Sequence, residues 1–141
     1  MVIASNSDDH VFYVSAEYVY ISGFSVTGAC YRKAGICLSN DCIIENCNVL
    51  DNEDGICLYY SSNNTIAGNT ASSNNFWEIL IFSSSNNTVS NNRVVGIYLH
   101  SSSNNNIVNN IIINCRNGIR FYDSSNYNKI ENNTISSNNW Y

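Results

Sequence analysis

Short apolar stretches alternate with polar ones along the whole chain at a nearly even spacing. A single apolar residue follows each asparagine-rich stretch, and these residues recur 23, 22, 23, 18 and 23 positions apart, at Ile21, Ile44, Ile66, Val89, Ile107 and Ile130. A second apolar column lies five positions further on, at Val26, Val49, Ala71, Val94, Ile112 and Ile135. A repeat of this length is typical of proteins in which each unit buries its apolar face against its neighbours.

Short strands are predicted by a second recurring phrase, Gly-Ile-x-Leu. Its copies and variants lie at residues 12–14, 35–38, 55–58, 78–81, 96–99 and 118–121. In each copy apolar residues alternate with a variable residue, which is the period of a strand with one buried face. No stretch of the chain sustains the period of a helix.

Glycine and asparagine mark the bends between the predicted strands. Two positions after each member of the first apolar column stand residues that tolerate a left-handed backbone: Gly23, Asn46, Gly68, Asn91, Asn109 and Asn132. Two other columns are predicted to form ladders of hydrogen-bonded side-chain amides: Asn64, Asn87, Asn105 and Asn128, and Asn69, Asn92, Asn110 and Asn133. Cys42 and Cys47 replace asparagine in these columns, and we expect their side chains to point inward.

Together these patterns predict an all-β fold, a right-handed, single-stranded parallel β-helix of about six coils of about 22 residues. We expect one domain over residues 1–141 with no capping helix, and residues 1–10 partly disordered or forming an incomplete coil. Residues 137–141 repeat the pattern of residues 73–77, so the chain is expected to end within a coil. Because an uncovered coil exposes unpaired strand groups, we expect a fragment of a longer repeat protein or end-to-end self-association.

Composition and charge exclude several classes of partner. Hydrophobic residues make up 44% of the chain, which argues against disorder despite the many asparagines and serines. The net charge of -5 leaves no basic stripe for nucleic acid. No apolar run is long enough for a membrane span, and no signal peptide is recognised in this chain. An extracellular or cell-surface location is expected if the chain is part of a longer exported protein.

The repeat phrases resemble those of a known family. Gly-Ile-x-Leu, Ser-Ser-Asn-Asn-Thr-Ile (residues 61–66) and Ile-x-x-Asn-x-Ile resemble the parallel β-helix repeats of the NosD-like family, over about residues 10–141. That family is similar to the carbohydrate-binding and sugar-hydrolase (CASH) domain of archaeal and bacterial surface proteins. The resemblance implies a pectin-lyase-like solenoid whose function lies outside the repeated scaffold positions.

Three functions follow from this resemblance as hypotheses. The first is a non-catalytic cell-surface or envelope module that binds carbohydrate or acts as a rigid spacer. The second is a piece of a polysaccharide lyase or hydrolase, for which the sequence provides no convincing carboxylate pair and no lyase-type site with Ca²⁺ and Arg. The third is a NosD-like accessory role in copper-site maturation. No catalytic residue and no cofactor is assigned.

A strip of aromatic residues is the candidate ligand-binding surface. The outward positions in and just after the Gly-Ile-x-Leu strands carry Tyr59, Phe82, Tyr98, His100, Arg120 and Tyr122. Sugar rings stack on such aromatic faces, and His or Arg hydrogen-bonds their hydroxyl or carboxylate groups. A polysaccharide or surface glycan is the predicted partner. The alternative is an aromatic ladder that only stabilises the stacked strands.

Carboxylates and cysteines offer weaker candidates for metal sites. Oxygen ligands for Ca²⁺ are present at Asp51, Glu53, Asp54 and Glu78. Ion pairing of Glu53 or Asp54 with Arg32 or Lys33 is the simpler interpretation. Six cysteines occur, at Cys30, Cys37, Cys42, Cys47, Cys57 and Cys115. Thiolates bind Cu(I), but packing in the interior is the favoured role of these cysteines. Cys37 and Cys57 share an outward column and are close enough for a disulfide, although the geometry of adjacent parallel strands disfavours one. The cluster Asp8-Asp9-His10 precedes the first complete coil.

Overall fold

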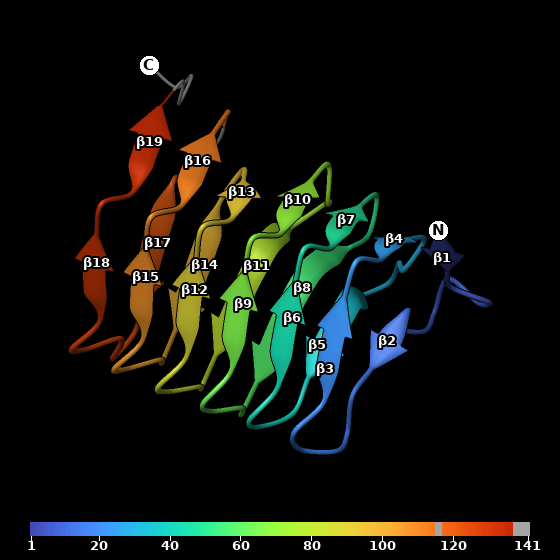
Figure 1. Ribbon diagram of the computed structural model, residues 1–141, viewed down its shortest axis with the longest axis horizontal. Coiled ribbons are helices and arrows are strands. Elements are labelled where there is room, and N and C mark those ends of the chain that lie inside the picture. The colour runs from blue at the N-terminus through green and yellow to red at the C-terminus, as the bar shows by residue number, and fades with distance from the viewer. Residues whose placement is uncertain (115–116, 137–141) are drawn as a thin grey trace.

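The computed structural model describes residues 1–114 and 117–136, and within these ranges the chain forms strands and no helix. Each coil contributes one strand to each of three parallel sheets (Figure 1). Sheet 1 contains β1 (Val2–Ile3), β4 (Ser25–Thr27), β7 (Asn48–Leu50), β10 (Thr70–Ser72), β13 (Arg93–Val94), β16 (Ile111–Ile113) and β19 (Thr134–Ser136). Sheet 2 contains β2 (Phe12–Tyr13), β5 (Ala34–Leu38), β8 (Asp54–Tyr59), β11 (Trp77–Phe82), β14 (Ile97–His100) and β17 (Ile119–Tyr122). Sheet 3 contains β3 (Tyr20–Ser22), β6 (Ile43–Glu45), β9 (Thr65–Ala67), β12 (Thr88–Ser90), β15 (Asn106–Val108) and β18 (Lys129–Glu131).

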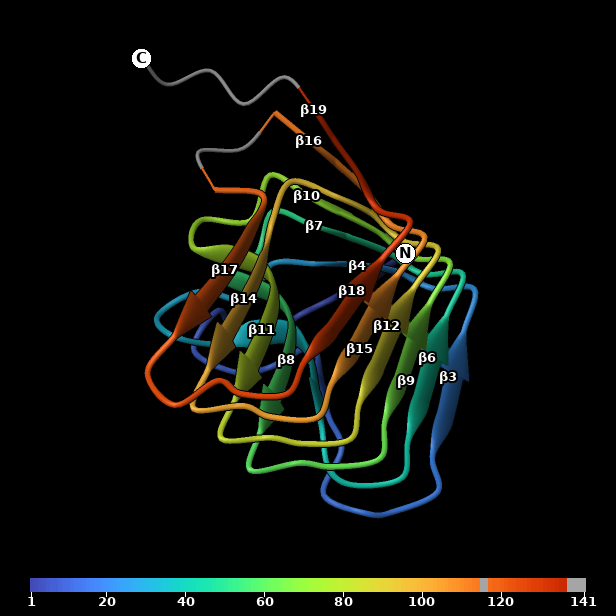
Figure 2. The ribbon, with the colours of Figure 1, turned by 90° about the vertical axis from the view of Figure 1, so that its left-hand side faces the viewer.

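The three sheets surround a common interior, as the view along the stack shows (Figure 2). Buried apolar side chains form one continuous core. Residues of the first apolar column are register partners in sheet 3, from Ile21 through to Ile130. The second apolar column is aligned in the same way in sheet 1. The predicted all-β parallel β-helix is therefore confirmed, and so are the columns on which the prediction depended.

The bends adopt the predicted backbone conformation. All six positions of the glycine and asparagine column have positive φ, from 54° at Asn132 to 78° at Gly23. Asparagine tolerates this region better than other residues with a Cβ, because its short polar side chain hydrogen-bonds locally. The sharp corner between sheet 3 and sheet 1 thus follows from the residue type at a single position in each coil.

Asparagine ladders connect the coils inside the corners. The amide oxygen of Asn92 accepts hydrogen bonds from the backbone and side-chain N–H groups of Asn69, at 2.8 and 3.1 Å. Its side-chain nitrogen donates to the carbonyl of Ile66 and to the Asn110 amide oxygen. The column that contains Asn64 repeats this pattern. Because each buried asparagine satisfies polar groups of the coils on both sides, the ladder specifies register as well as stability.

Cysteine and serine residues also contribute to the hydrogen bonds between successive coils. Cys42 and Cys47 are buried, and their backbone N–H groups donate to the amide oxygens of Asn64 and Asn69, so the predicted inward orientation is confirmed. A serine ladder that the sequence analysis did not recognise runs through Ser61, Ser84, Ser102 and Ser125. The hydroxyls of Ser84, Ser102 and Ser125 each accept a hydrogen bond from the backbone N–H of the serine in the preceding coil.

The last described coil leaves its core side chains partly open. Phe121, Ile130 and Ile135 are 39%, 43% and 44% exposed, whereas their column neighbours in the preceding coil are buried. The predicted end-to-end association stays a prediction. Residues 137–141, on which the expected end within a coil depends, lie outside the described residues.

Replacing Asn92 with alanine is expected to destabilise the protein by roughly 3 kcal/mol, because it leaves the buried backbone N–H of Asn69 without a partner and removes the side-chain hydrogen bonds of Asn92 to Ile66 and Asn110. The matched control is Asn48→Ala, since Asn48 lies exposed in β7, and it should change stability little. The free energy of unfolding in urea measures both. Equal effects of the two substitutions would contradict the proposed role of the ladder.

Candidate functional site

The outer face of sheet 2 carries most of the chemically distinctive side chains. In β5, β8 and β11 the core-facing residues are aligned isoleucines and leucines, and the residues between them point outward. A second, smaller apolar cluster therefore lies on the outer face, where Ala34, Cys37, Cys57 and Leu80 are covered by Trp77, Phe82 and Tyr98. This cluster forms the floor of the candidate site.

The predicted aromatic strip is in register on this face. Tyr59, Phe82, His100 and Tyr122 are aligned from coil to coil, and so are Cys57, Leu80, Tyr98 and Arg120. Ring centroids of successive members of the first row are 5.7, 4.7 and 5.1 Å apart. Tyr59 and Tyr122 are exposed, whereas the rings between them are partly covered by their neighbours. We call these four residues the aromatic row.

Arg120 and Trp77 extend the aromatic row sideways. The Arg120 guanidinium carbon lies 5.3 Å from the Tyr98 ring centroid and 5.7 Å from that of Tyr122. Trp77 stacks on Tyr98 with centroids 4.3 Å apart. Trp77 is the register partner of Asp54. It lies two positions before Ile79, where the regular alternation of inward and outward residues begins. The repeat phrase does not include this position and therefore did not predict that Trp77 faces outward.

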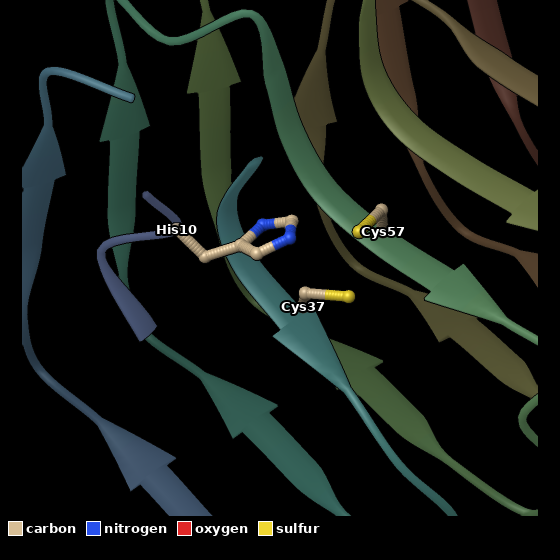
Figure 3. Close-up of side chains that lie close together, drawn as sticks. All are labelled: His10, Cys37 and Cys57. Atoms are coloured by element: carbon tan, nitrogen blue, oxygen red, sulfur yellow. The ribbon is translucent and has the colours of Figure 1, made fainter. Parts of the chain in front are cut away.

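A histidine and two cysteines converge at the N-terminal end of the same face. The sulfur atoms of Cys37 and Cys57 and a ring nitrogen of His10 all lie within 4.8 Å of one another (Figure 3). Cys37 and Cys57 are register partners on β5 and β8, so parallel stacking itself brings the sulfurs together. His10 comes from the segment before β2, and Figure 3 shows its ring turned toward the two sulfurs. We call these residues the sulfur–imidazole cluster.

Hydrogen bonds define the protonation of this cluster. The Ala34 backbone N–H donates to Nδ1 of His10 at 2.9 Å, which leaves the proton of the neutral ring on Nε2. Burial, and then the positive charge of Lys33, lower the pKa of His10 and favour this neutral form. A hydrogen bond from Cys57 lowers the pKa of the Cys37 thiol, whereas burial raises that of Cys57. The sulfur pair therefore loses its first proton at Cys37 and holds the second at Cys57.

The donor set of the cluster suits a soft metal ion. Two thiolates and an imidazole are the ligands that Cu(I) and Zn²⁺ prefer, and they bind when the thiols have lost their protons. Cys57 is fully buried and Cys37 nearly so. A hollow of about 360 Å³, lined partly by His10, Cys37 and Tyr59, reaches the cluster from outside. The sequence analysis placed the two cysteines correctly in one outward column but did not bring His10 to them.

The four candidate Ca²⁺ ligands are divided between surface and interior. Asp51 is exposed and Glu53 partly exposed, whereas Asp54 and Glu78 are buried. Burial is the main cause that raises the pKa of Asp54 to about 6 and that of Glu78 to about 7. Among the described residues no ion pair joins Arg32 or Lys33 to Glu53 or Asp54. Ca²⁺ binding by these carboxylates stays a prediction, as does the polysaccharide-cleaving alternative.

The fold and the site define a parallel β-helix with an aromatic outer face and a sulfur–imidazole cluster. The chain matches, over residues 3–141, the model of a family described as periplasmic copper-binding protein (NosD). The chain therefore belongs to the NosD family, as its repeat phrases predicted. No curated protein and no solved structure matches it. A periplasmic family agrees with the predicted envelope location, and the described part of the chain has no helix that could cross a membrane.

The raised pKa values of Asp54 and Glu78 predict how stability depends on pH. The folded state holds these protons more tightly than the unfolded state, in which the ordinary pKa values are 3.8 and 4.5. Stability is therefore expected to fall as the pH rises from about 4 to about 7, by up to roughly 3 kcal/mol for each group. The double variant Asp54→Asn with Glu78→Gln should lack this fall.

Urea unfolding midpoints measured across this pH range test the expectation, with Asp51→Asn as the control because Asp51 is exposed. If the stability of the double variant fell with pH as much as that of the unsubstituted protein, Asp54 and Glu78 would not be the groups responsible.

Proposed function

We propose that this protein is an envelope β-helix module that binds copper as Cu(I) through Cys37 and Cys57, with His10 completing the site. The observation that carries the proposal is the convergence of two sulfurs and an imidazole within 4.8 Å on a scaffold whose family is described as copper-binding. When bound, copper would be the cargo of the module, held in its reduced state by soft ligands.

The two cysteines are expected to provide most of the affinity. Parallel register places their sulfurs next to each other without any change in the backbone. The shared hydrogen bond leaves one proton to be displaced at Cys57, after Cys37 has ionised. Leu80, Trp77 and Phe82 pack around the sulfurs and exclude water from them.

His10 is expected to contribute less than either cysteine. A histidine ligand ordinarily donates a hydrogen bond from its second nitrogen, but here Nδ1 accepts one from Ala34. Nε2 therefore carries the ring proton and can donate it toward a thiolate sulfur. Nε2 of His10 can bind the metal only when the ring proton moves to Nδ1 and the Ala34 hydrogen bond is given up. In the tautomer described here, His10 stabilises the negative charge on sulfur.

Competition for Cu(I) with a chromogenic chelator tests this proposal in anaerobic solution. We expect one Cu(I) per chain, with affinity reduced about a hundredfold or more by Cys37→Ser or Cys57→Ser and roughly tenfold by His10→Gln. Cys30→Ser is the matched control, because Cys30 does not belong to the cluster. The proposal fails if the Cys37 and Cys57 variants bind Cu(I) as tightly as the control.

We infer a second candidate function, carbohydrate binding, from the aromatic row. Its rings follow one another from coil to coil along the stack, with Arg120 held against Tyr98 and Tyr122. Such a row presents ring faces and edges over several coils, which suits an extended glycan whose sugar units lie along the stack. The rigid-spacer role predicted from the repeats is compatible with either function.

A glycan array tests the second candidate. Tyr98→Ala combined with Tyr122→Ala should abolish binding to any glycan that the unsubstituted protein retains, because the double variant removes two rings and both contacts of Arg120. Tyr18→Ala with Tyr127→Ala is the control, since both tyrosines are highly exposed and lie outside the aromatic row. Glycan binding that survives in the Tyr98 and Tyr122 variant would exclude this surface.

A further inference from the structure

A second hollow lies on the outer face of sheet 2, beside the sulfur–imidazole cluster and the aromatic row. It has a volume of about 310 Å³, with aromatic walls formed by Tyr59, Phe76 and Trp77 and polar lining from Arg32, Glu53 and Asp54. Neither function proposed above uses Asp54, Phe76 or Trp77 as a binding group.

Asp54 lines this hollow and has one carboxylate oxygen without a hydrogen-bond partner. The residue is only 7% exposed. Its Oδ1 atom has no hydrogen-bond partner, and among the described residues the only other buried side-chain atom in this condition is Oδ1 of Asn106. A buried acceptor without a donor is costly. The residue therefore favours a ligand that brings a hydrogen-bond donor into the hollow.

The charge of the lining indicates which kind of donor is preferred. Arg32 and Glu53 carry opposite charges, so the carboxylate of Asp54 makes the net charge of the lining negative. No ion pair to Asp54 is found among the described residues. An ammonium group both donates a hydrogen bond and compensates a buried negative charge, whereas a hydroxyl group only donates. Aromatic walls also attract cations through their ring faces.

We propose that this hollow binds the primary ammonium group of a small aliphatic amine. The ammonium N–H donates to the carboxylate of Asp54, which lines the hollow, and the alkyl chain lies against Phe76 and Trp77. Binding occurs in the absence of copper and does not require the aromatic row beyond Tyr59. The inference goes beyond the proposed functions and does not depend on either of them.

Isothermal titration of the protein with n-butylamine, at about pH 8 where the amine is protonated, tests the proposal. The unsubstituted protein should bind one butylammonium ion, and Asp54→Asn should weaken binding about tenfold or more. Asp51→Asn should leave it unchanged, because Asp51 lies exposed in the same loop outside the hollow. 1-Butanol, which has the same alkyl chain without the charge, should not compete.

Amide chemical-shift mapping of the unsubstituted protein provides a readout that does not depend on a folded Asp54 variant. Addition of butylamine should shift the resonances of Asp54, Phe76 and Trp77 most strongly. The proposal is overturned if butylamine does not bind, if the shifts lie elsewhere, if Asp54→Asn binds as tightly, or if 1-butanol binds equally well.

Discussion

The structure depends on the register in which successive coils stack. Backbone hydrogen bonds between parallel strands would tolerate a shift of one coil against the next, but the buried asparagines do not. From Asn87 and Asn92 onward, each ladder amide oxygen accepts from both a backbone N–H and a side-chain N–H of the preceding coil, and a shift would break these pairs inside the corner. The ladders thus select one register among the several that similar strands could adopt.

This register also determines what can be built on the outer face of sheet 2. Because coils are aligned residue by residue, a cysteine in one coil is placed directly beside a cysteine in the next, and the same alignment gives Tyr59, Phe82, His100 and Tyr122 as one row. The segment before Ile79 departs from the repeat and adds a hollow to the outer face. There Trp77 and Asp54 face outward together and form a hollow beside the regular part of the sheet.

Features that repeat could be predicted from the sequence, and features that occur once could not. The two apolar columns and the left-handed bends recur from coil to coil, and the asparagine ladders run through the coils from Asn64 onward. Aligning the repeat phrases was therefore enough to predict them. His10 lies two residues before Phe12, and no later coil carries a histidine at the corresponding position, so the repeat phrases do not mark it. The burial of Asp54 and Glu78 was also missed, because a loop carboxylate is ordinarily exposed and its covering by Trp77 follows from a local break in the alternation.

The central functional claim is that stacking of adjacent coils creates a copper site from two cysteines. Copper K-edge X-ray absorption of the Cu(I)-loaded protein tests it most directly, because the spectrum counts sulfur and nitrogen neighbours of the metal. Two sulfur neighbours per copper, reduced to one in the Cys37→Ser variant, are the result that this account predicts. A shell of nitrogen and oxygen alone, or a sulfur count that Cys37→Ser leaves unchanged, would contradict it.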